Sequence, residues 1–199
     1  VYTVPTPVDT DRILPMDSKL KSEKKDVVIG WLGIGEGVKY LSLVRDALRE
    51  AARRHPVRLR VVTLLTGKKL ELDGIETELV DWKLEEECLQ MNRFDIGISP
   101  LFDAPWERGK CSLKLLQFMA AGLPTVSSRA GMNQEIIEDG KDGFLAGDTE
   151  EWVHKLGRLI QDADLRKKMG EAAREKVIRE YSLNKMAGVL CKALQEVAA

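Results

Sequence analysis

Lys110, Lys114 and Gln117 are polar side chains at helical spacing within an otherwise apolar stretch of the chain. Residues three or four apart lie on one face of a helix, and helical side chains tilt toward its amino-terminal end. The three groups are therefore aimed at the start of a helix expected over residues 112–121. Free N–H groups and the positive end of the helix dipole favour an anion there, and we expect Ser112 to cap the helix.

The partner of Lys114 decides what this helix does, because a buried lysine is costly unless it is paired. One interpretation is that an anionic ligand binds at the helix start. The alternative is that Lys114 pairs with an internal carboxylate and Gln117 caps a backbone group. The clustering of two lysines near one helix start favours the ligand.

A glycine-rich loop follows a buried strand expected over residues 26–32. Gly33, Gly35 and Gly37 come directly after this strand, and a helix is expected over residues 38–55. Glycines allow the backbone to approach a ligand closely, and a helix start attracts anions. The loop predicts further contacts to a phosphate or another ligand, with a plain tight turn as the alternative.

Other candidate residues lie in separate loops. Gly131 and Glu135 follow a buried strand, and Glu135 either faces a polyhydroxy ligand or caps a short helix. Trp82 ends a strand and either stacks on a base or packs in the core. His55 and His154 have no partner at catalytic or metal-binding spacing, so we expect them to be structural or solvated.

Strands and helices alternate through most of the chain, and this order decides where the candidate residues meet. Continuous apolar runs bounded by charge and glycine are typical of strands buried on both faces of a parallel sheet. The pattern predicts an α/β fold: a Rossmann-like, doubly wound, mostly parallel sheet of about six strands with flanking helices. Ligands bind at the carboxyl ends of such strands, so the loops above should share one edge. The strands are expected over residues 26–32, 57–65, 76–82, 94–99, 124–128 and 143–146, and the helices over residues 38–55, 85–91, 112–121, 164–180 and 183–197, with one more beginning in a capping-box pattern at Asp148 and Glu151.

Composition excludes several classes of protein. The 199 residues include 31 Lys and Arg against 32 Asp and Glu, and nucleic-acid binding needs a positive excess. No apolar run reaches the ~18 residues of a membrane span, and residues 1–25 lack a signal-peptide pattern. Three separated cysteines without a CxxC pair predict neither a disulfide framework nor a zinc site. We expect a cytoplasmic protein whose membrane contact is peripheral at most; its start at Val1 suggests a fragment or a processed product.

Residues 94–149 carry two motifs at a specific distance from each other. The first, KLLxxMAxGxP, begins at Lys114, and the second, ExxxDGxxGFL, begins at Glu135. With these motifs the chain resembles the carboxyl-terminal half of retaining glycosyltransferases that have two Rossmann-like domains, the GT-B fold (glycosyl transferases group 1 type). Weaker similarity extends from residues 6–11, which resemble the interdomain hinge, to residues 181–182.

The resemblance implies that this half binds a nucleotide-diphosphate sugar as its donor substrate, with no other cofactor and no metal. Gln117 lies where many members have a Glu that holds the ribose hydroxyls. Trp82 would lie beside the base, and Gly131 and Glu135 near the sugar. The residues implied at the diphosphate are Gly33, Gly35, Lys110, Lys114 and the amides of Cys111, Ser112 and Leu113.

The chain departs from the family pattern at a pair of glutamates that many members carry eight positions apart. Those positions are Gly109 and Gln117 here. The nearest acid is Glu107, which we take with Lys114 as a catalytic candidate.

A second departure concerns the Arg and Lys that many members have in the first glycine loop. The matching positions are Trp31 and Glu36. We therefore assign more of the phosphate binding to Lys110 and Lys114.

The expected organisation has three parts: residues 1–25 as a linker or interdomain hinge, residues 26–181 as a nucleotide-sugar-binding domain, and residues 182–199 as a carboxyl-terminal helix. This helix would pack toward an amino-terminal acceptor-binding domain that the chain lacks. The expected function is donor binding in a glycosyltransferase that transfers a sugar with retention, with little activity from this part alone. The alternatives are half of a GT-B sugar-nucleotide epimerase or phosphorylase, and a non-catalytic nucleotide-binding module.

Overall fold

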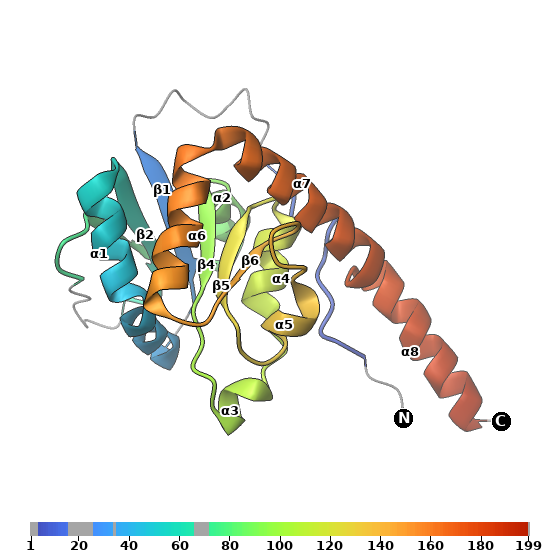
Figure 1. Cartoon of the computed structure of the whole chain (residues 1–199). Coiled ribbons are helices and arrows are strands. Elements are labelled where there is room, and N and C mark those ends of the chain that lie inside the picture. The colour runs from blue at the N-terminus through green and yellow to red at the C-terminus, as the bar shows by residue number, and fades with distance from the viewer. Residues whose placement is uncertain (1–3, 16–25, 34, 66–71, 199) are drawn as a thin grey trace.

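The computed structural model describes residues 4–15, 26–33, 35–65 and 72–198. Within these residues, six parallel strands form one sheet in the order β3-β2-β1-β4-β5-β6 (Figure 1). The order proceeds outward on both sides from β1 and β4, as in a doubly wound sheet, and confirms the predicted fold. The strands are β1 (Val27–Leu32), β2 (Val57–Thr63), β3 (Thr77–Asp81), β4 (Ile96–Ser99), β5 (Thr125–Ser128) and β6 (Phe144–Ala146).

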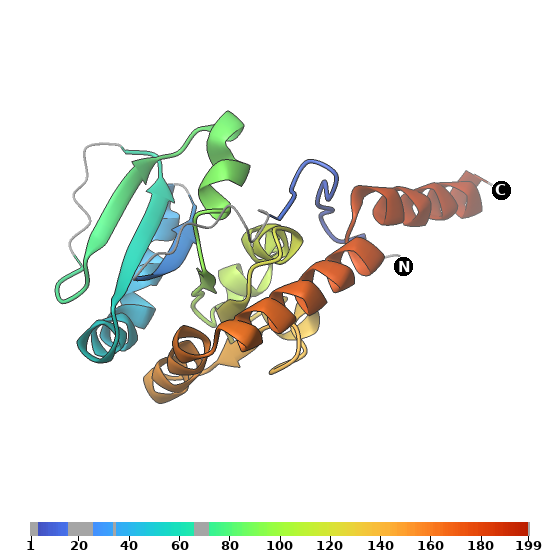
Figure 2. The ribbon, with the colours of Figure 1, turned by 90° about the horizontal axis from the view of Figure 1, so that it is seen from above.

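Helices cover both faces of the sheet. They are η2 (Gly35–Val44) and η3 (Leu84–Glu86), which are 3₁₀ helices, and the α-helices α1 (Arg45–Arg54), α2 (Glu87–Met91), α3 (Pro105–Arg108), α4 (Leu113–Ala120), α5 (Asn133–Ile136), α6 (Thr149–Gln161), α7 (Ala163–Glu180) and α8 (Leu183–Ala198). α1 packs against α6 on one face, and α4 packs against α7 on the other (Figures 1 and 2).

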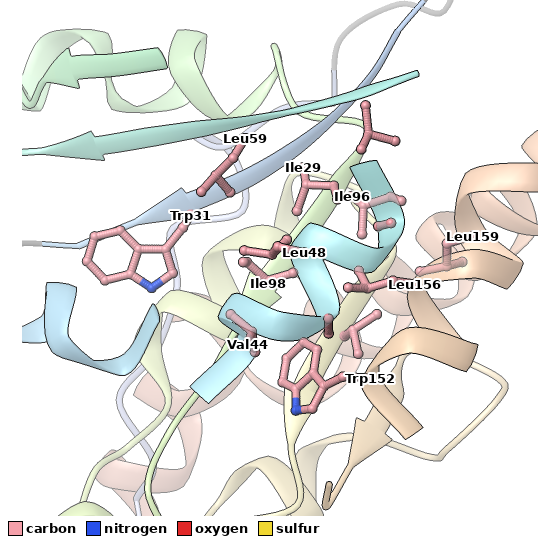
Figure 3. Packing of buried hydrophobic residues seen from close by; sticks show 14 of the residues in the cluster. Ile29, Trp31, Val44, Leu48, Leu59, Ile96, Ile98, Trp152, Leu156 and Leu159 are labelled. Atoms are coloured by element: carbon pink, nitrogen blue, oxygen red, sulfur yellow. The ribbon is translucent and has the colours of Figure 1, made fainter. Parts of the chain in front are cut away.

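Alternate residues of β1 point into two separate cores. Ile29 and Trp31 lie in the core beneath α1 and α6, whereas Val28 and Leu32 lie in the core beneath α4 and α7. Figure 3 shows the first core, where Leu48 of α1 lies among side chains from the sheet and from α6. Burial on both faces explains why β1 is continuously apolar.

The chain after β1 differs from the prediction. It continues as the ten-residue 3₁₀ helix η2, and regular α-helix begins only at Arg45. Gly35 starts η2 with a φ of 58°, a left-handed backbone that suits glycine, and glycine also weakens an α-helix. The four-residue helix α3 lies outside the expected helices, because it is too short to show a helical period in sequence.

The start of α6 agrees with the capping-box prediction. The Asp148 carboxylate accepts a hydrogen bond from the Glu151 amide at 2.8 Å, and the Glu151 carboxylate accepts one from the Gly147 amide at 2.6 Å. These contacts fix the point at which the chain leaves β6 and enters the helix.

Residues 4–15 lie along α7 and the start of α8. Val8 forms a parallel bridge with Ser182, and Val8 and Ile13 are both buried. Arg174 on α7 donates a hydrogen bond to the Ile13 carbonyl oxygen at 2.8 Å. The segment is therefore anchored to the α/β unit, while the division of the chain into domains stays a prediction.

α8 projects away from the sheet (Figure 2). Met186 is its buried residue, and its exposed apolar side chains are Leu183, Leu190, Leu194 and Val197. No helix in the described part of the chain is both long enough and apolar enough to cross a bilayer.

Candidate functional site

Most of the predicted site residues lie at the edge of the sheet where the parallel strands end. Gly33 follows β1, Trp82 follows β3 and Gly131 comes after β5. The chain leaving β4 passes through α3 and enters α4, so the amino-terminal end of α4 lies at this edge too. The topology therefore gathers loops that are far apart in sequence, as the predicted sheet required.

Ser112 directly precedes α4 in an unusual backbone conformation. It has φ 52° and ψ 34°, and it is the one non-glycine residue with positive φ in the described part of the chain. The prediction that Ser112 caps the helix is wrong, because a capping side chain needs an extended backbone to reach the first amides. Its buried Oγ has no hydrogen-bond partner among the described residues. The first amides of α4 therefore have no capping side chain, and an unpaired hydroxyl lies next to them. Both kinds of group can donate hydrogen bonds to an anion.

The Lys114 ammonium lies at the end of β1, above the ring of Trp31. Its Nζ is 3.9 Å from the ring centroid, and a Cβ added to Gly33 would come within 2.7 Å of Nζ. Glycine at position 33 is therefore needed for this close approach. Burial and the like charge of Lys110 are the influences on the Lys114 ammonium, and no carboxylate among the described side chains pairs with it. The predicted alternative of an internal ion pair is therefore not what these residues form.

Burial, and to a lesser extent the nearby charge of Lys110, lower the pKa of the Lys114 ammonium to about 7. An isolated buried ammonium is unfavourable because it loses hydration without gaining a counter-charge. An anion bound at the start of α4 would restore that counter-charge. The cation–π contact with Trp31 replaces only part of the lost hydration.

Trp31 stands where the resembled family often has an arginine for the phosphates. Its ring is fully buried in the core under α1 and α6 (Figure 3). It supplies an aromatic wall for Lys114 and no positive charge. The shift of phosphate binding toward the lysines, expected from the sequence, fits this position.

Lys110, Tyr40 and Glu107 form a chain of hydrogen bonds between α3 and η2. The Lys110 ammonium donates to the Tyr40 hydroxyl at 2.6 Å, and the hydroxyl donates to the Glu107 carboxylate at 2.7 Å. Lys110 also lies 4.5 Å from the centroid of the Tyr40 ring. Glu107 is 6% exposed, and the bond from Tyr40 holds the pKa of its carboxyl below the ordinary value.

Sequence reasoning missed Tyr40 in this chain of contacts. It lies in η2 and is buried against Phe102, whose ring centroid is 5.3 Å away in an edge-to-face arrangement. In sequence the residue fits an ordinary helix face. No spacing signal linked it to Glu107, which is 67 residues away.

Gln117 lies one turn after Lys114 and contacts a carboxylate that the sequence analysis did not single out. Its Nε2 donates to Glu87 Oε1 at 2.7 Å, and Trp82 Nε1 donates to Glu87 Oε2 at 2.9 Å. Glu87 begins α2, five residues after Trp82. The predicted backbone-capping role of Gln117 is therefore replaced by a side-chain pair.

The remaining predicted residues lie around these groups. Cys111 is half-buried, Leu113 is exposed on the first turn of α4, and the Gly35 backbone is open, with space where a side chain would stand. Gly131 has a φ of 50°, and an added Cβ would lie 3.2 Å from Arg108 Cα, so this loop packs against α3. Glu135 is exposed in α5 and does not cap it.

Two hollows lie away from Lys110 and Lys114. One, of about 240 Å³, lies at the ends of β4, β5 and β6 beside Asp103 and Arg129. The other, of about 510 Å³, is a hollow between α1 and α6 that both histidines line. His55 Nε2 is 3.3 Å from Gln161 Nε2, and no metal-binding cluster is found in the part of the chain that the structure describes.

Comparison with known proteins identifies the family. The model of the family described as Glycosyl transferases group 1 matches residues 26–162. The chain belongs to this family. The match covers all six strands together with Lys110 and Lys114, and it confirms the resemblance found in the sequence.

Relatives and solved structures of the family share both sequence and fold with this chain. The sulfoquinovosyl transferase SQD2 of Arabidopsis thaliana is 42% identical over 156 residues, which cover 74% of this chain and 28% of that protein. The crystal structure of Anabaena HepE in complex with UDP-glucose has a TM-score of 0.75 at 18% identity, covering 96% of this chain and 56% of HepE. The chain thus spans well under two thirds of these relatives.

One neighbour has nearly the same extent as this chain. The crystal structure of the C-terminal domain of the glycosyl transferase group 1 family protein LpcC, from Francisella tularensis, has a TM-score of 0.65 at 20% identity. The alignment covers 88% of this chain and 99% of that domain. The shared fold is that of a separate domain of a family member.

Proposed function

We propose that this chain is the donor-binding domain of a glycosyltransferase that transfers a sugar, with retention, from a nucleotide-diphosphate sugar to an acceptor. The observation that carries the proposal is the unpaired Lys114 ammonium beside the uncapped start of α4 and the unpaired Ser112 hydroxyl, within the described residues. A diphosphate matches all three features because it supplies negative charge and several strong acceptors. HepE, a structural neighbour, was solved with UDP-glucose, which supports the ligand class.

In the proposed reaction the domain stabilises the leaving diphosphate. As the bond between sugar and diphosphate breaks, negative charge grows on the phosphate oxygens while the sugar gains oxocarbenium character. Donors that are already in place favour this charge without reorganising. Lys114 and the first amides of α4 are those donors, and Lys110 adds a second positive charge nearby.

Glu107 acts in this proposal through its neighbours. Its carboxylate is buried and accepts from Tyr40, which in turn accepts from Lys110. The chain of contacts holds Lys110 at the site edge and attaches α3 to η2. Direct contact between Glu107 and a sugar stays a prediction.

The acceptor would be bound by a domain outside this chain, as the sequence analysis expected. We propose that this domain contacts the apolar stripe of α8, whose Leu190, Leu194 and Val197 are exposed. The chain matches only part of the length of its relatives, which is consistent with a further domain.

The test is a calorimetric titration of the chain with UDP, GDP, ADP and CMP. We expect one diphosphate to bind and Lys114→Met to weaken it by about 1–3 kcal/mol, as for a charge-assisted contact. Lys185→Met is the matched control, because Lys185 is an exposed lysine on α8. Equal binding by the chain and by Lys114→Met would contradict the proposed site.

The second candidate is a non-catalytic nucleotide-binding module. The favouring observation is that the family's glutamate pair is absent at Gly109 and Gln117, while Glu107 is already engaged with Tyr40. A full-length protein that binds a nucleotide but neither hydrolyses nor transfers from its sugar conjugate would support this candidate over the enzyme.

A further inference from the structure

Glu87 is a carboxylate that links two residues of the candidate nucleotide site. One oxygen accepts from the Trp82 indole and the other from the Gln117 amide, at 2.9 and 2.7 Å. The indole N–H is only a donor, and the ionised carboxylate is only an acceptor. Glu87 must therefore present oxygens to both partners.

This arrangement fixes the orientation of the Gln117 amide. If the amide turned over, its oxygen would face a carboxylate oxygen at hydrogen-bond distance, and both atoms carry negative charge. The NH₂ group is thus held on Glu87, and the carbonyl oxygen faces elsewhere. Among the described residues this oxygen has no hydrogen-bond partner.

The position of the pair relates it to the ligand. Gln117 follows Lys114 by three residues on α4, so the two lie on the same helix face. Trp82 leaves the end of β3 at the same edge of the sheet. The carboxylate of Glu87 therefore lies behind two side chains that border the proposed nucleotide site.

We propose that Glu87 is a positioning residue of this site: it orients the Gln117 amide so that its carbonyl oxygen accepts a hydrogen bond from the vicinal hydroxyls of the nucleotide ribose. The inference rests on the proposed function. Negative charge on Glu87 strengthens the Gln117 oxygen as an acceptor, because hydrogen bonds in a chain polarise one another. In this proposal the negative charge lies on Glu87 of α2, which acts on the ligand through Gln117. The group on α4 that contacts the ligand is then a neutral amide.

The same pair positions Trp82. An indole held by its N–H to a carboxylate has a fixed ring plane, which suits a residue beside a flat base. A glutamine at position 87 would still have an oxygen to accept from the indole, so Glu87→Gln should affect the ribose hydroxyl contact and leave the base contact in place.

The test exchanges the two side chains. The variants are Glu87→Gln, Gln117→Glu and the double exchange, with Glu85→Gln as a control that removes an exposed charge two residues away. Each is titrated with UDP, or with the diphosphate that the chain prefers, and with the 2′,3′-dideoxy form of that nucleotide. Thermal unfolding of every variant reports on folding separately.

The chemistry of the pair predicts the outcome. In Glu87→Gln the new amide can donate to the Gln117 oxygen, which turns that amide over and uses the acceptor. We expect a loss of affinity for the ribonucleotide of about tenfold, with little change for the dideoxy form. Gln117→Glu places two carboxylates together and should also weaken binding by about tenfold.

The double exchange restores a donor–acceptor pair, because the amide introduced on α2 can donate to the carboxylate introduced on α4 while its oxygen accepts from Trp82. We expect ribonucleotide affinity within about threefold of the unaltered chain, and full discrimination against the dideoxy form. Losses that simply add in the double exchange, or an unchanged preference for the ribose hydroxyls in Glu87→Gln, would overturn the inference alone. Failure of the unaltered chain to bind any diphosphate would overturn the proposed function, and this inference with it.

Discussion

At the scale of single residues, Lys114 sets the properties of the site. Its side chain is half-buried, and its ammonium contacts an aromatic ring and a glycine backbone, with a second lysine nearby. Such a group lowers the stability of the free domain and becomes favourable when an anion binds. That balance has two measurable consequences.

The first prediction concerns stability. The Lys114 pKa falls from its ordinary value of 10.5 to about 7 on folding, so the unfolded chain binds more protons between these two pH values. The free energy of unfolding therefore rises as the pH increases from about 7 to 10.5, because Lys114 destabilises the fold less and less over this range. Below pH 7 Lys114 has its full destabilising effect. Lys114→Met should raise the midpoint of thermal unfolding by roughly 3 °C or more at pH 6.5 and by less at pH 9.5. A midpoint that falls equally at both pH values would contradict this account.

The second prediction concerns the pH dependence of binding. A bound diphosphate favours the charged form of Lys114, so binding should raise its pKa and take up a proton above pH 7. Affinity should decrease from pH 8 to pH 9.5, a range in which the terminal phosphate is almost fully ionised because the second pKa of such a phosphate is about 6. Calorimetry in buffers of different ionisation enthalpy measures the proton uptake. Lys114→Met should show neither the uptake nor the pH trend.

At the scale of elements, the start of α4 combines a functional geometry with backbone strain. Ser112 has a left-handed backbone and a buried hydroxyl that is unpaired within the described residues. A non-glycine residue in this conformation costs about 1–2 kcal/mol, and such strain concentrates at functional sites. The strain sets the direction of the chain as it enters α4.

The third prediction separates the strain from the hydroxyl. Ser112→Gly relieves the backbone and should raise the free energy of unfolding by about 1 kcal/mol, whereas Ser112→Ala keeps the strained backbone. Both variants lose the hydroxyl, so both should bind the diphosphate more weakly than the unaltered chain. Denaturant unfolding and calorimetry together distinguish the two effects. Equal stability of the glycine and alanine variants would show that the position is not strained.

The elements show which features a sequence can predict. β1, β4 and β6 are short apolar runs that are largely buried, whereas β3 is only half-buried. A mostly parallel, doubly wound sheet could therefore be predicted from hydrophobic pattern. The 3₁₀ form of η2 could not be predicted, because the spacing of its apolar residues suits an α-helix as well as a 3₁₀ helix. α3 has four residues, which are too few to show a helical period in sequence. A helix this short also needs tertiary packing in order to form.

The candidate site was only partly predictable. Lys114 and Gly33 were identified because helix spacing and loop glycines act over short distances in sequence. Glu87 and Tyr40 were missed because each meets its partner across the fold, at separations of 30 and 67 residues. Ser112 was identified for the wrong reason, since its capping role depended on a backbone angle that the sequence does not display.

At the scale of the whole molecule, the architecture places the binding groups and the projecting helix on different parts of the domain. The lysines lie at the carboxyl edge of the sheet, while α8 extends away with exposed apolar side chains (Figure 2). The α/β unit has two complete cores of its own, one on each face of the sheet. The groups of the proposed nucleotide site therefore all belong to this unit, whereas the exposed apolar side chains of α8 lie outside it.

The last prediction follows from that separation of roles. The chain alone should bind a nucleoside diphosphate yet transfer no sugar at a measurable rate, because transfer needs an acceptor held against the donor, and positioning of this kind supplies a large share of rate enhancement.

A longer polypeptide that adds an acceptor-binding domain should turn over. Leu194→Glu on the exposed stripe of α8 should lower the transfer rate of that polypeptide while leaving the diphosphate affinity of the isolated chain unchanged. Glu196→Gln on the same helix turn serves as the matched surface control. Robust transfer by the 199-residue chain would instead show that the acceptor site lies within the α/β unit, and the hollow beside Asp103 and Arg129 would then be the place to examine.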